Sequence, residues 1–365
     1  MQRVVLHIDF DYFYAQCEEN LDHSIRGRPV VVCVYSGRTQ ESGVVSTCNY
    51  EARKYGVKAG IPIVRARKLL QETQGVFLPM NKPHYEEVSD RIMGILEANG
   101  DHFEKAGIDE AFLDLTSRTR GEFREAEQIA VEIRREVLEQ EQITCSVGIA
   151  PNKLLAKMAS DRNKPNGLTV VAPEHVSEFL GGLPVNEIPG VGRKTEEKLE
   201  QMEIRRIDQL AAIDVSILHQ KFGISLGTYL HRAALGEDDN PVKERDQPTQ
   251  FSRIATLKTN THQASEILPL LRTLASAVSE KLAMKTMICR TISVIAILAD
   301  LSIHTRSKTL ESPTCDEKTI TQASAELIEQ LLQSMPSATV RRVGVKLSAL
   351  SIRSGQTNIS KFLPQ

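Results

Sequence analysis

Residues 3–19, RVVLHIDFDYFYAQCEE, are the stretch from which the fold and a candidate site can be predicted. The stretch is mostly apolar from Val4 to Ile8, which predicts a buried strand. It then places Asp9 and Asp11 two positions apart and follows them with three aromatic residues. The end of this strand is therefore the first candidate for a functional site.

A second pair of carboxylates lies in residues 102–115, HFEKAGIDEAFLDL. Two short strand-like pieces flank Asp109 and Glu110, which predicts a hairpin with acids near its bend. If this hairpin pairs with the first strand, Asp9 comes within a few ångströms of both acids. At an effective dielectric near 20, two like charges ~4 Å apart repel by roughly 4 kcal/mol. Such a cluster takes up protons or binds cations.

The ligand chemistry narrows the choice of cation. Oxygen ligands without a matching His or Cys favour Mg²⁺ or Mn²⁺, and two such ions about 4 Å apart suit displacement at phosphorus. The alternative is that these acids form surface turns and salt bridges. The apolar flanks at 4–8 and 111–113 favour the first interpretation, because they anchor the acids to a core.

The order of predicted elements indicates an α+β layer in the first half. Strands are expected at 3–8, 29–35 and 144–150, and helices at 15–21, 84–100 and 126–140. Strand, helix, hairpin, helix, strand is the order of a ferredoxin-like layer. Residues 11–79 would then be an insertion after the first strand.

The second half repeats this order without repeating the sequence. Residues 173–236 are expected to be mostly helical, and GEDDNPVKERDQP (236–248) is a polar linker with prolines. The expected elements after it are a strand at 253–257, a helix at 264–283, a hairpin at 289–310, a helix at 319–332 and a strand at 341–350.

The composition is that of a globular protein with several domains. The chain has 365 residues, 41% of them hydrophobic and 25% charged, which predicts two to four domains. It contains neither an apolar run long enough for a membrane span nor a signal-peptide pattern, so we expect a cytoplasmic protein. The six cysteines form no C-x-x-C pair and are expected to be reduced and mostly buried.

The net charge of −2 conceals an asymmetry between the two halves. Residues 1–240 carry 29 basic and 37 acidic side chains, a net charge of −8, whereas residues 241–365 carry 16 and 10, a net charge of +6. The basic half suits nucleic acid, although an imbalance on solvated faces explains the counts equally well.

Six motifs, in this order, resemble those of the Y-family translesion DNA polymerases of the DinB branch, most closely the archaeal ones. The match covers essentially the whole chain, and six motifs in one order make the resemblance far more specific than a lone acidic pair. The motifs are HIDFDYFYAQCEE (7–19), VVVCVYSGR (30–38), SGVVSTCNYEARKYGVKAGIP (42–62), GIDEAFLDLT (107–116), CSVGIAPNKLLAKMASDRNKPNGL (145–168) and IPGVGRKTEEKLEQMEI (188–204).

The resemblance implies an α+β multidomain, right-hand polymerase that performs low-fidelity, template-directed synthesis past damaged bases. Its implied substrates are primer-template DNA and deoxynucleoside triphosphates (dNTP), and its cofactors are two Mg²⁺ ions, for which Mn²⁺ can substitute. We expect a monomer. The implied parts are a ferredoxin-like palm (1–10 and 80–172), small fingers (11–79), a helix-hairpin-helix thumb (173–239), a linker (240–246), a β-α-β-β-α-β little finger (247–353) and a clamp-binding tail (354–365).

The motifs also imply roles for single residues. Asp9, Asp109, Glu110 and the backbone carbonyl of Phe10 would hold the metals, and Tyr14 would be the steric gate against ribonucleotides. Asp11 is expected to be a turn or helix-start residue rather than a ligand. Gly107 departs from the family, whose members usually carry Ser there. The implied dNTP contacts are Phe13, Tyr14, Val44, Ser46, Thr47, Tyr50, Arg53 and Lys164.

Two further sets of residues are expected to bind DNA. IPGVGRKT (188–195) lacks the spacing of a phosphate-binding loop. It fits a helix-hairpin-helix, in which Gly190 and Gly192 let backbone N–H groups approach a DNA phosphate, although a purely structural tight turn is the alternative. Arg253, Arg341 and Arg342 would contact backbone phosphates from the little finger.

The tail GQTNISKFLPQ (355–365) resembles the peptide by which replication proteins bind a sliding clamp of the PCNA type. A short helical turn would gather Ile359, Phe362 and Leu363 on one side, with Gln356 left to hydrogen-bond beside them. The alternative is a terminus that folds back onto its own domain.

Two other function classes remain as alternatives. Nucleotide cyclases share a ferredoxin-like catalytic layer with metal-binding acids, but the thumb-like hairpin and the basic second half argue against them. A non-catalytic DNA-binding protein could keep the fold, but the three acids count against that interpretation.

Overall fold

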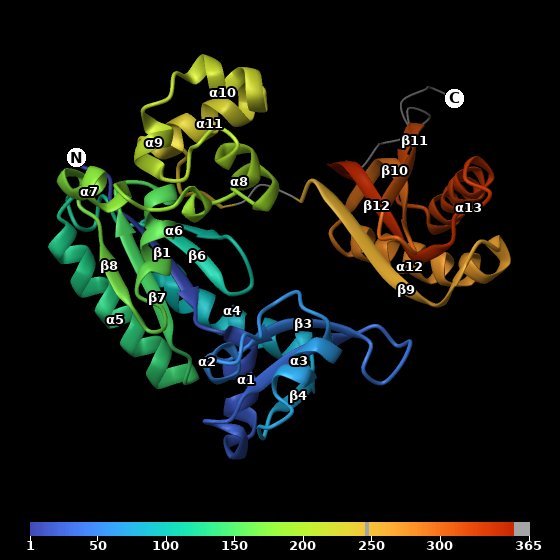
Figure 1. Ribbon diagram of the computed structural model, residues 1–365, viewed down its shortest axis with the longest axis horizontal. Coiled ribbons are helices and arrows are strands. Elements are labelled where there is room, and N and C mark those ends of the chain that lie inside the picture. The colour runs from blue at the N-terminus through green and yellow to red at the C-terminus, as the bar shows by residue number, and fades with distance from the viewer. Residues whose placement is uncertain (245–247, 354–365) are drawn as a thin grey trace, which may run out of the picture. The chain divides into compact units, whose positions relative to one another are not determined.

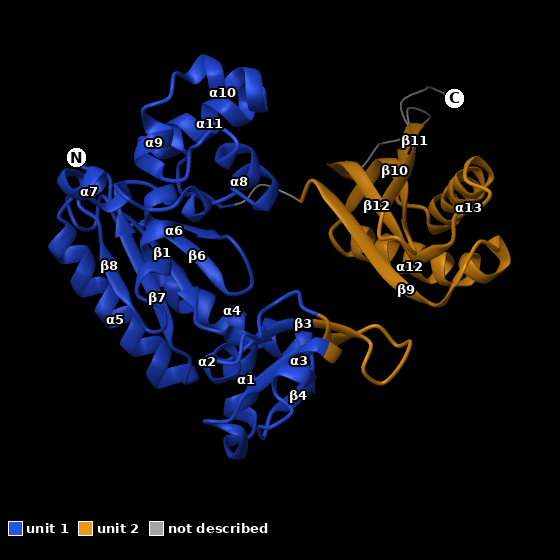
Figure 2. Cartoon of the chain, in the orientation of Figure 1, with its two compact units in different colours: residues 1–33, 45–61, 65–245 blue, residues 34–44, 62–64, 246–365 orange. Residues whose placement is uncertain are grey.

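The computed structural model describes residues 1–244 and 248–353 (Figure 1). These residues fall into two compact units, coloured separately in Figure 2. Unit 1 comprises Met1–Cys33, Val45–Ile61 and Arg65–Arg245, and unit 2 comprises Val34–Val44, Pro62–Val64 and Asp246–Gln365. In the described part of the chain, no helix is long and apolar enough to cross a membrane.

The main sheet of unit 1 confirms the predicted ferredoxin-like layer. Strand β1 lies between β6 and β7 and runs antiparallel to both. The prediction missed β8, which adds to the edge parallel to β7, because three residues are too few to show a period. In sheet order the strands are β5 (His102–Lys105), β6 (Glu110–Asp114), β1 (Val5–Phe10), β7 (Cys145–Ala150) and β8 (Leu168–Val170).

The alternation of side chains along β1 separates core from site. Leu6, Ile8 and Phe10 belong to the core that includes buried residues of α4 (Lys82–Asn99) and α5 (Phe123–Glu141). The residues between them, from Val5 through His7 to Asp9, point to the opposite face. That face is covered by α6 (Lys153–Arg162) (Figure 1). The strand therefore has a second, increasingly polar face beneath α6.

Gly148 lets α6 pack directly on the sheet. It lies opposite His7 in the register of β1 and β7. A Cβ at this position would lie 2.1 Å from the carbonyl oxygen of Ala156 and 2.4 Å from the amide nitrogen of Ser160. Any other residue would push the helix away, so this glycine fixes the distance between α6 and the acids of β1.

A smaller sheet and three helices make up the predicted insertion. The strands are β3 (Gly43–Cys48), β2 (Val30–Tyr35) and β4 (Val76–Pro79), in that order, and the helices are α1 (Phe13–Leu21), α2 (Tyr50–Arg53) and α3 (Ile63–Leu69). Asn49 caps α2, because its side chain accepts a hydrogen bond from the amide of Ala52. The cap turns the chain sharply between β3 and α2.

The segment after the main sheet is mostly helical, as predicted. Leu199, Leu218 and Leu230 share a buried cluster with Leu154 and Leu155 of α6. These contacts fix the helical segment to the same face of the sheet that carries Asp9. Its helices are α7 (Val176–Leu180), α8 (Arg193–Glu200), α9 (Ile207–Ala211), α10 (Val215–Phe222) and α11 (Ile224–Ala234).

The chain leaving α11, including the first residues of the linker expected at 240–246, packs against unit 1. Val242 is buried with the α6 cluster. The side-chain amide of Asn152 donates to the carbonyl of Gly236 at 2.7 Å. The guanidinium of Arg3 donates to the carbonyl of Asn240 at 2.6 Å. The described residues up to 244 are therefore bound to unit 1, which polar composition alone does not reveal.

Unit 2 contains a four-stranded antiparallel sheet with two helices. The predicted β-α-β-β-α-β order is confirmed, but the sheet order differs from that of unit 1: the first strand, β9, lies at an edge. The long helices share one core with the sheet. In sheet order the strands are β11 (Ile303–Thr314), β10 (Met287–Leu298), β12 (Val340–Ile352) and β9 (Gln250–Thr261), and the helices are α12 (Ala264–Met284) and α13 (Glu317–Ser334).

Candidate active site

The three predicted acids meet at one end of the main sheet in unit 1. Asp9 and Glu110 are direct partners in the register of β1 and β6. Asp109 precedes β6, and its carbonyl accepts a hydrogen bond from the amide of Phe10 at 2.8 Å. The strand pairing that builds the sheet therefore also brings these carboxylates to one place.

Burial makes the charge on two of these acids unfavourable. It raises the pKa of Asp9 to about 6, against the opposing effect of Lys164. Burial also raises the pKa of Asp109, and the charge of Glu110 acts in the same direction. Burial therefore disfavours the ionised forms of Asp9 and Asp109, even with Lys164 beside Asp9.

Lys164 is the cation beside Asp9. Its ammonium lies 2.7 Å from Oδ1 of Asp9 and 2.7 Å from Oδ1 of Asp161. Although burial opposes the charged form, these carboxylates raise the pKa of Lys164. Because Lys164 has two carboxylate partners, it can leave Asp9 for another anion and still keep its ion pair with Asp161.

Glu110 has two basic neighbours that the sequence analysis missed. Lys157 of α6 forms an ion pair with Oε2 of Glu110, and Nε2 of the buried His7 lies 3.4 Å from the same oxygen. His7 and Lys157 together lower the pKa of Glu110 to about 2. The two-residue spacing of His7 and Asp9 on one strand was the signal that could have found His7.

The donor set fits a hard divalent cation. Carboxylate oxygens, with the carbonyl of Phe10 nearby in the chain, are ligands that Mg²⁺ prefers. Among residues 1–244 and 248–353, no three His, Cys, Asp or Glu side chains lie so that they could hold a metal ion as they stand. Lysine ammonium groups instead offset the charges of Asp9 and Glu110, so these carboxylates must exchange partners before they can hold a metal.

Asp11 is a structural residue in the turn after β1. Its buried carboxylate accepts hydrogen bonds from Thr144 at 2.9 Å, from Ser146 at 2.7 Å and from the amide of Asn166 at 2.8 Å. It does not cap α1, whose N-cap position is Tyr12. Three donors fully engage this carboxylate, which fits the expected turn role rather than a ligand role.

The predicted gate residue is held rigidly. The ring of Tyr14 stacks on the buried ring of Tyr85, with centroids 4.5 Å apart and planes 14° apart. The hydroxyl of Tyr85 in turn donates to Glu18. Phe13, expected to contact the nucleotide, is only 2% exposed and packs in the core against Phe10, so its ring supports Tyr14 from within.

The predicted triphosphate contacts begin on β3 and α2. The guanidinium of Arg53 lies 4.5 Å from the centroid of the Tyr50 ring, and its Nε donates to the carbonyl of Cys48 at 3.2 Å. Thr47 lies on β3, two residues before Asn49, which caps α2. On the same strand, Val44 and Ser46 are two positions apart and so point to one face.

Gly107 leaves room beside the acids. A Cβ there would lie 3.1 Å from Cγ of Glu110 and 3.4 Å from Oδ1 of Asp109. These contacts are tight, so a Ser, which the resemblance leads us to expect here, would press on both side chains. The glycine therefore leaves Glu110 more freedom than a serine would.

The predicted helix-hairpin-helix has a turn suited to glycine. Gly190 has a φ of +86°, and Gly192 is the N-cap residue of α8. A short 3₁₀ helix, Val185–Glu187, precedes the turn where a phosphate-binding loop would have a strand. The local structure therefore agrees with the hairpin interpretation and not with a nucleotide-binding loop.

The sheet register of unit 2 separates the three predicted arginines. Arg342 lies opposite Thr256 on the face without helices, together with Lys346 opposite Ser252. Arg253 is three positions from Thr256 on β9 and so points to the other face. Arg341, next to Arg342, is only partly exposed. Their DNA contacts stay a prediction, and the structure favours Arg342 and Lys346 as a pair.

The sheet face without helices also carries hydroxyl groups beside Lys346. Ser293 and Ser307 hydrogen-bond across β10 and β11 at 2.8 Å, and Thr291 and Thr309 do so at 3.3 Å. Ser293 itself is buried, so the exposed hydroxyls of Ser307 and Thr309 are the ones that suit contacts with phosphate and sugar oxygens. The predicted clamp contacts Gln356, Ile359, Phe362 and Leu363 lie outside the described residues.

Family models match three stretches of the chain. Residues 8–161 match the impB/mucB/samB family, residues 186–238 match the DNA polymerase-iota thumb domain, and residues 248–360 match the C-terminal domain of the impB/mucB/samB family. The last two matches cover the helical segment and the sheet of unit 2.

Curated relatives match over the full length. The chain is 42% identical over 361 residues to the DNA polymerase IV of Nitrosopumilus maritimus, covering 99% of each chain. It is 45% identical over 368 residues to the DNA polymerase IV of Methanosarcina acetivorans, covering 99% of this chain and 100% of the relative.

Solved structures agree. A Y-family polymerase chimera of Dbh and Dpo4 has a TM-score of 0.90 at 39% identity, and an insertion ternary complex of Dbh DNA polymerase has a TM-score of 0.68 at 39% identity. Each match covers 96% of this chain and 99% of the other.

The chain belongs to the Y-family of DNA-directed DNA polymerases, in its DinB-type DNA polymerase IV branch. Dependence on divalent metal follows from this membership in general terms, and the nucleotide cyclase alternative is discarded.

The raised pKa of Asp109 predicts a stability change with pH. Because its pKa is higher in the folded chain than the ordinary value of 3.8, the ionised carboxylate destabilises the fold, and this penalty grows as the pH rises through the folded pKa. In EDTA at about pH 7.5, we expect Asp109→Asn to melt a few degrees above the wild type. The gain should shrink as the pH falls through the folded pKa of Asp109, because the carboxyl is then protonated and as uncharged as asparagine. Thermal unfolding across pH measures this, and a gain independent of pH would contradict it.

Proposed function

We propose that this polymerase performs low-fidelity, template-directed synthesis past damaged bases, using Mg²⁺ and dNTP. The observation that carries the proposal is the convergence of Asp9, Asp109 and Glu110 at one end of the main sheet, two of them with raised pKa values. Family membership supplies the reaction class. We also propose the palm, fingers, thumb, linker (240–246) and little-finger boundaries given from the sequence.

In the proposed reaction, Asp9, Asp109, Glu110 and the carbonyl of Phe10 would hold two Mg²⁺ ions. Bound there, such ions would supply activation of the primer 3′-hydroxyl and stabilisation of the charge that develops on the phosphates. Burial disfavours the ionised forms of Asp9 and Asp109, and a bound cation would stabilise those forms. The hydrogen bond from Phe10 to the carbonyl of Asp109 holds the strand ends together at 2.8 Å.

The chain's cations and hydroxyls bind the triphosphate in this proposal. Lys164 moves from its two carboxylates to a phosphate oxygen, and Arg53 and Tyr50 approach from α2 with Thr47 beside them. Donors to the leaving pyrophosphate offset the charge that appears there. Tyr14, fixed by its stacking on Tyr85, fills the space that a ribose 2′-hydroxyl needs.

Primer extension on damaged templates tests the proposed function. The wild-type chain should extend a primer opposite and beyond an abasic site or an oxidised guanine, and should do so with mismatches on undamaged DNA. Synthesis that stops one nucleotide before every lesion, with high accuracy elsewhere, would contradict translesion activity while leaving polymerase activity intact.

DNA binding is proposed to use the face of the unit 2 sheet without helices, together with the backbone at Gly190 and Gly192. Each phosphate contact removed should reduce the magnitude of the log–log salt slope by about 0.9 on duplex DNA. We therefore expect Arg342→Ala and Lys346→Ala to lower it by about that amount each. Deleting the chain from residue 247 should lower it more and weaken binding strongly.

The matched control for this prediction is Lys318→Ala. Lys318 is an exposed cation on α13, among the helices of unit 2. The substitution removes one positive charge, as Arg342→Ala and Lys346→Ala do, but leaves the sheet face unchanged. Equal slopes for all three single variants, measured by fluorescence anisotropy at several salt concentrations, would show that the sheet face does not bind DNA.

The proposed clamp contact predicts a selective effect of the tail. Deleting residues 356–365 should leave synthesis on short primers unchanged but remove stimulation by a sliding clamp, because the tail recruits the enzyme and takes no part in chemistry. Primer extension with and without clamp measures this. Undiminished stimulation of the deleted protein would show that the contact lies elsewhere.

A further inference from the structure

Glu110 has two basic residues beside one of its carboxylate oxygens. Its Oε2 forms an ion pair with Lys157 and lies 3.4 Å from Nε2 of His7. The side chains of Glu110 and Lys157 are 26% and 32% exposed. They are therefore shielded from solvent more than a surface pair but remain accessible to an ion.

The main chain of Lys157 is held firmly in place. Its carbonyl accepts a hydrogen bond from Oγ of Ser160 at 2.8 Å, and the same Oγ lies 2.7 Å from Nδ1 of the buried His7. Gly148 lets this turn of α6 lie against the sheet. Only the flexible end of Lys157 is left to move.

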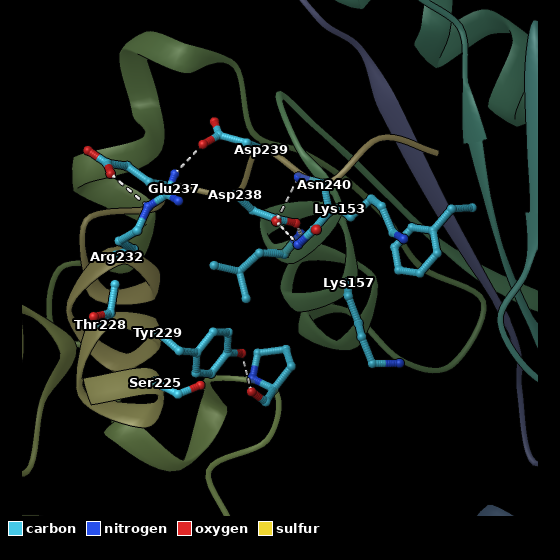
Figure 3. A pocket seen from close by; sticks show the side chains of 13 residues that line it. Lys153, Lys157, Ser225, Thr228, Tyr229, Arg232, Glu237, Asp238, Asp239 and Asn240 are labelled. Atoms are coloured by element: carbon cyan, nitrogen blue, oxygen red, sulfur yellow. Dashed lines mark hydrogen bonds and ion pairs between the residues drawn. The ribbon is translucent and has the colours of Figure 1, made fainter. Parts of the chain in front are cut away.

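A cavity beside Lys157 gives that end somewhere to go. Lys157 lines a cavity of about 430 Å³ between α6 and α11, together with Ser225, Thr228 and Tyr229 (Figure 3). The other cations of this cavity are engaged with other acids: Lys153 with Glu104 at 2.5 Å, and Arg232 with Asp239 at 2.5 Å. Lys157 alone among these three pairs with a proposed metal ligand.

We propose that Lys157 is a positioning residue: its ammonium holds Glu110 in the metal-free enzyme and moves into the cavity when Glu110 binds a divalent cation. This inference rests on the proposed metal site. In this role, the ammonium of Lys157 and the divalent cation compete for the same carboxylate oxygen of Glu110. Glu110 therefore becomes a metal ligand only when the cation displaces the ammonium.

The proposal predicts a gain in metal binding when the lysine is removed. A divalent ion that uses Glu110 must first displace the ammonium, and it also experiences repulsion from that charge. The apparent affinity for the cation is reduced when only a minority of molecules have Glu110 unpaired from Lys157, and it rises when that state becomes dominant. We expect Lys157→Met to bind Mn²⁺ roughly tenfold more tightly than the wild type, by the same argument.

The test is a Mn²⁺ titration of the full chain, without DNA or nucleotide, followed by electron paramagnetic resonance. Lys153→Met is the matched control, because it removes the same charge from the same helix but breaks an ion pair with Glu104 instead of Glu110. It should bind Mn²⁺ within about twofold of the wild type, since its charge is lost away from the site. Lys157→Gln checks that the effect does not depend on methionine, and Lys157→Arg should restore the wild-type affinity.

Glu110→Gln and Asp109→Asn separate this inference from the metal site itself. If both reduce Mn²⁺ binding but Lys157→Met equals the wild type, Lys157 is not a competitor and the inference is overturned. If neither changes Mn²⁺ binding in any background, the proposed metal site is wrong. A tenfold gain in Lys157→Met that Glu110→Gln abolishes supports both.

Discussion

Replacing Asp109 or Glu110 with alanine is expected to abolish nucleotide incorporation while primer–template binding stays close to that of the wild type. Each change removes a carboxylate that the proposal gives to the metals, and loss of even one electrostatic contact to the reacting groups costs about 10²–10³-fold in rate. The proposed duplex contacts lie on other elements, including the sheet of unit 2. Single-turnover incorporation and equilibrium DNA binding, measured on the same preparations, separate the two effects.

Asp114→Asn is the control for this prediction. Asp114 lies on the same strand as Glu110 but at its other end, opposite Val5, and its carboxylate is 3.7 Å from Arg3. Its incorporation rate should stay close to that of the wild type. If the alanine variants lose binding and incorporation in equal measure, the acids act on DNA affinity and the assignment fails.

Tyr14→Ala should raise the ratio of ribonucleotide to deoxynucleotide incorporation by about 10²-fold, the scale on which a close-fitting pocket discriminates. The ring of Tyr14 cannot yield to a 2′-hydroxyl, because it is stacked on the buried Tyr85 with centroids 4.5 Å apart. Removing the ring opens that space. Single-nucleotide incorporation of matched ribo- and deoxyribonucleotides gives the ratio directly.

Tyr14→Phe separates the ring from the hydroxyl. It keeps the stacked ring and should discriminate against ribonucleotides as the wild type does. An alanine variant with unchanged sugar discrimination would place the gate on another residue, whereas a phenylalanine variant as permissive as alanine would assign the effect to the hydroxyl.

The sequence predicted the elements of the fold better than their arrangement. Apolar periodicity located β1, the helices α4 and α5 and the long elements of unit 2, because each is long enough to show a period. It could not give the order of strands in a sheet. Both sheets follow the same β-α-β-β-α-β sequence, yet β1 lies inside its sheet and β9 at an edge, because strand order depends on contacts between distant residues.

The candidate site divides in the same way. The acids could be predicted because strand ends and a hairpin bend mark them in the sequence. The partners of the acids could not, since Lys157 reaches Glu110 only through the packing of α6 over Gly148. The register likewise separates Arg253 from Arg342, although both are cations on strands of one sheet.

The most direct test of the central claim is single-nucleotide incorporation by the full chain on four primer–templates that differ only in the templating base. Each dNTP is supplied in turn, first in EDTA and then with Mg²⁺ restored. We predict no incorporation in EDTA and, with Mg²⁺, a rate for the complementary dNTP that exceeds the rates for the other three on every template. Incorporation in EDTA, or the same preferred dNTP on all four templates, would contradict a metal-dependent, template-directed polymerase site at Asp9, Asp109 and Glu110.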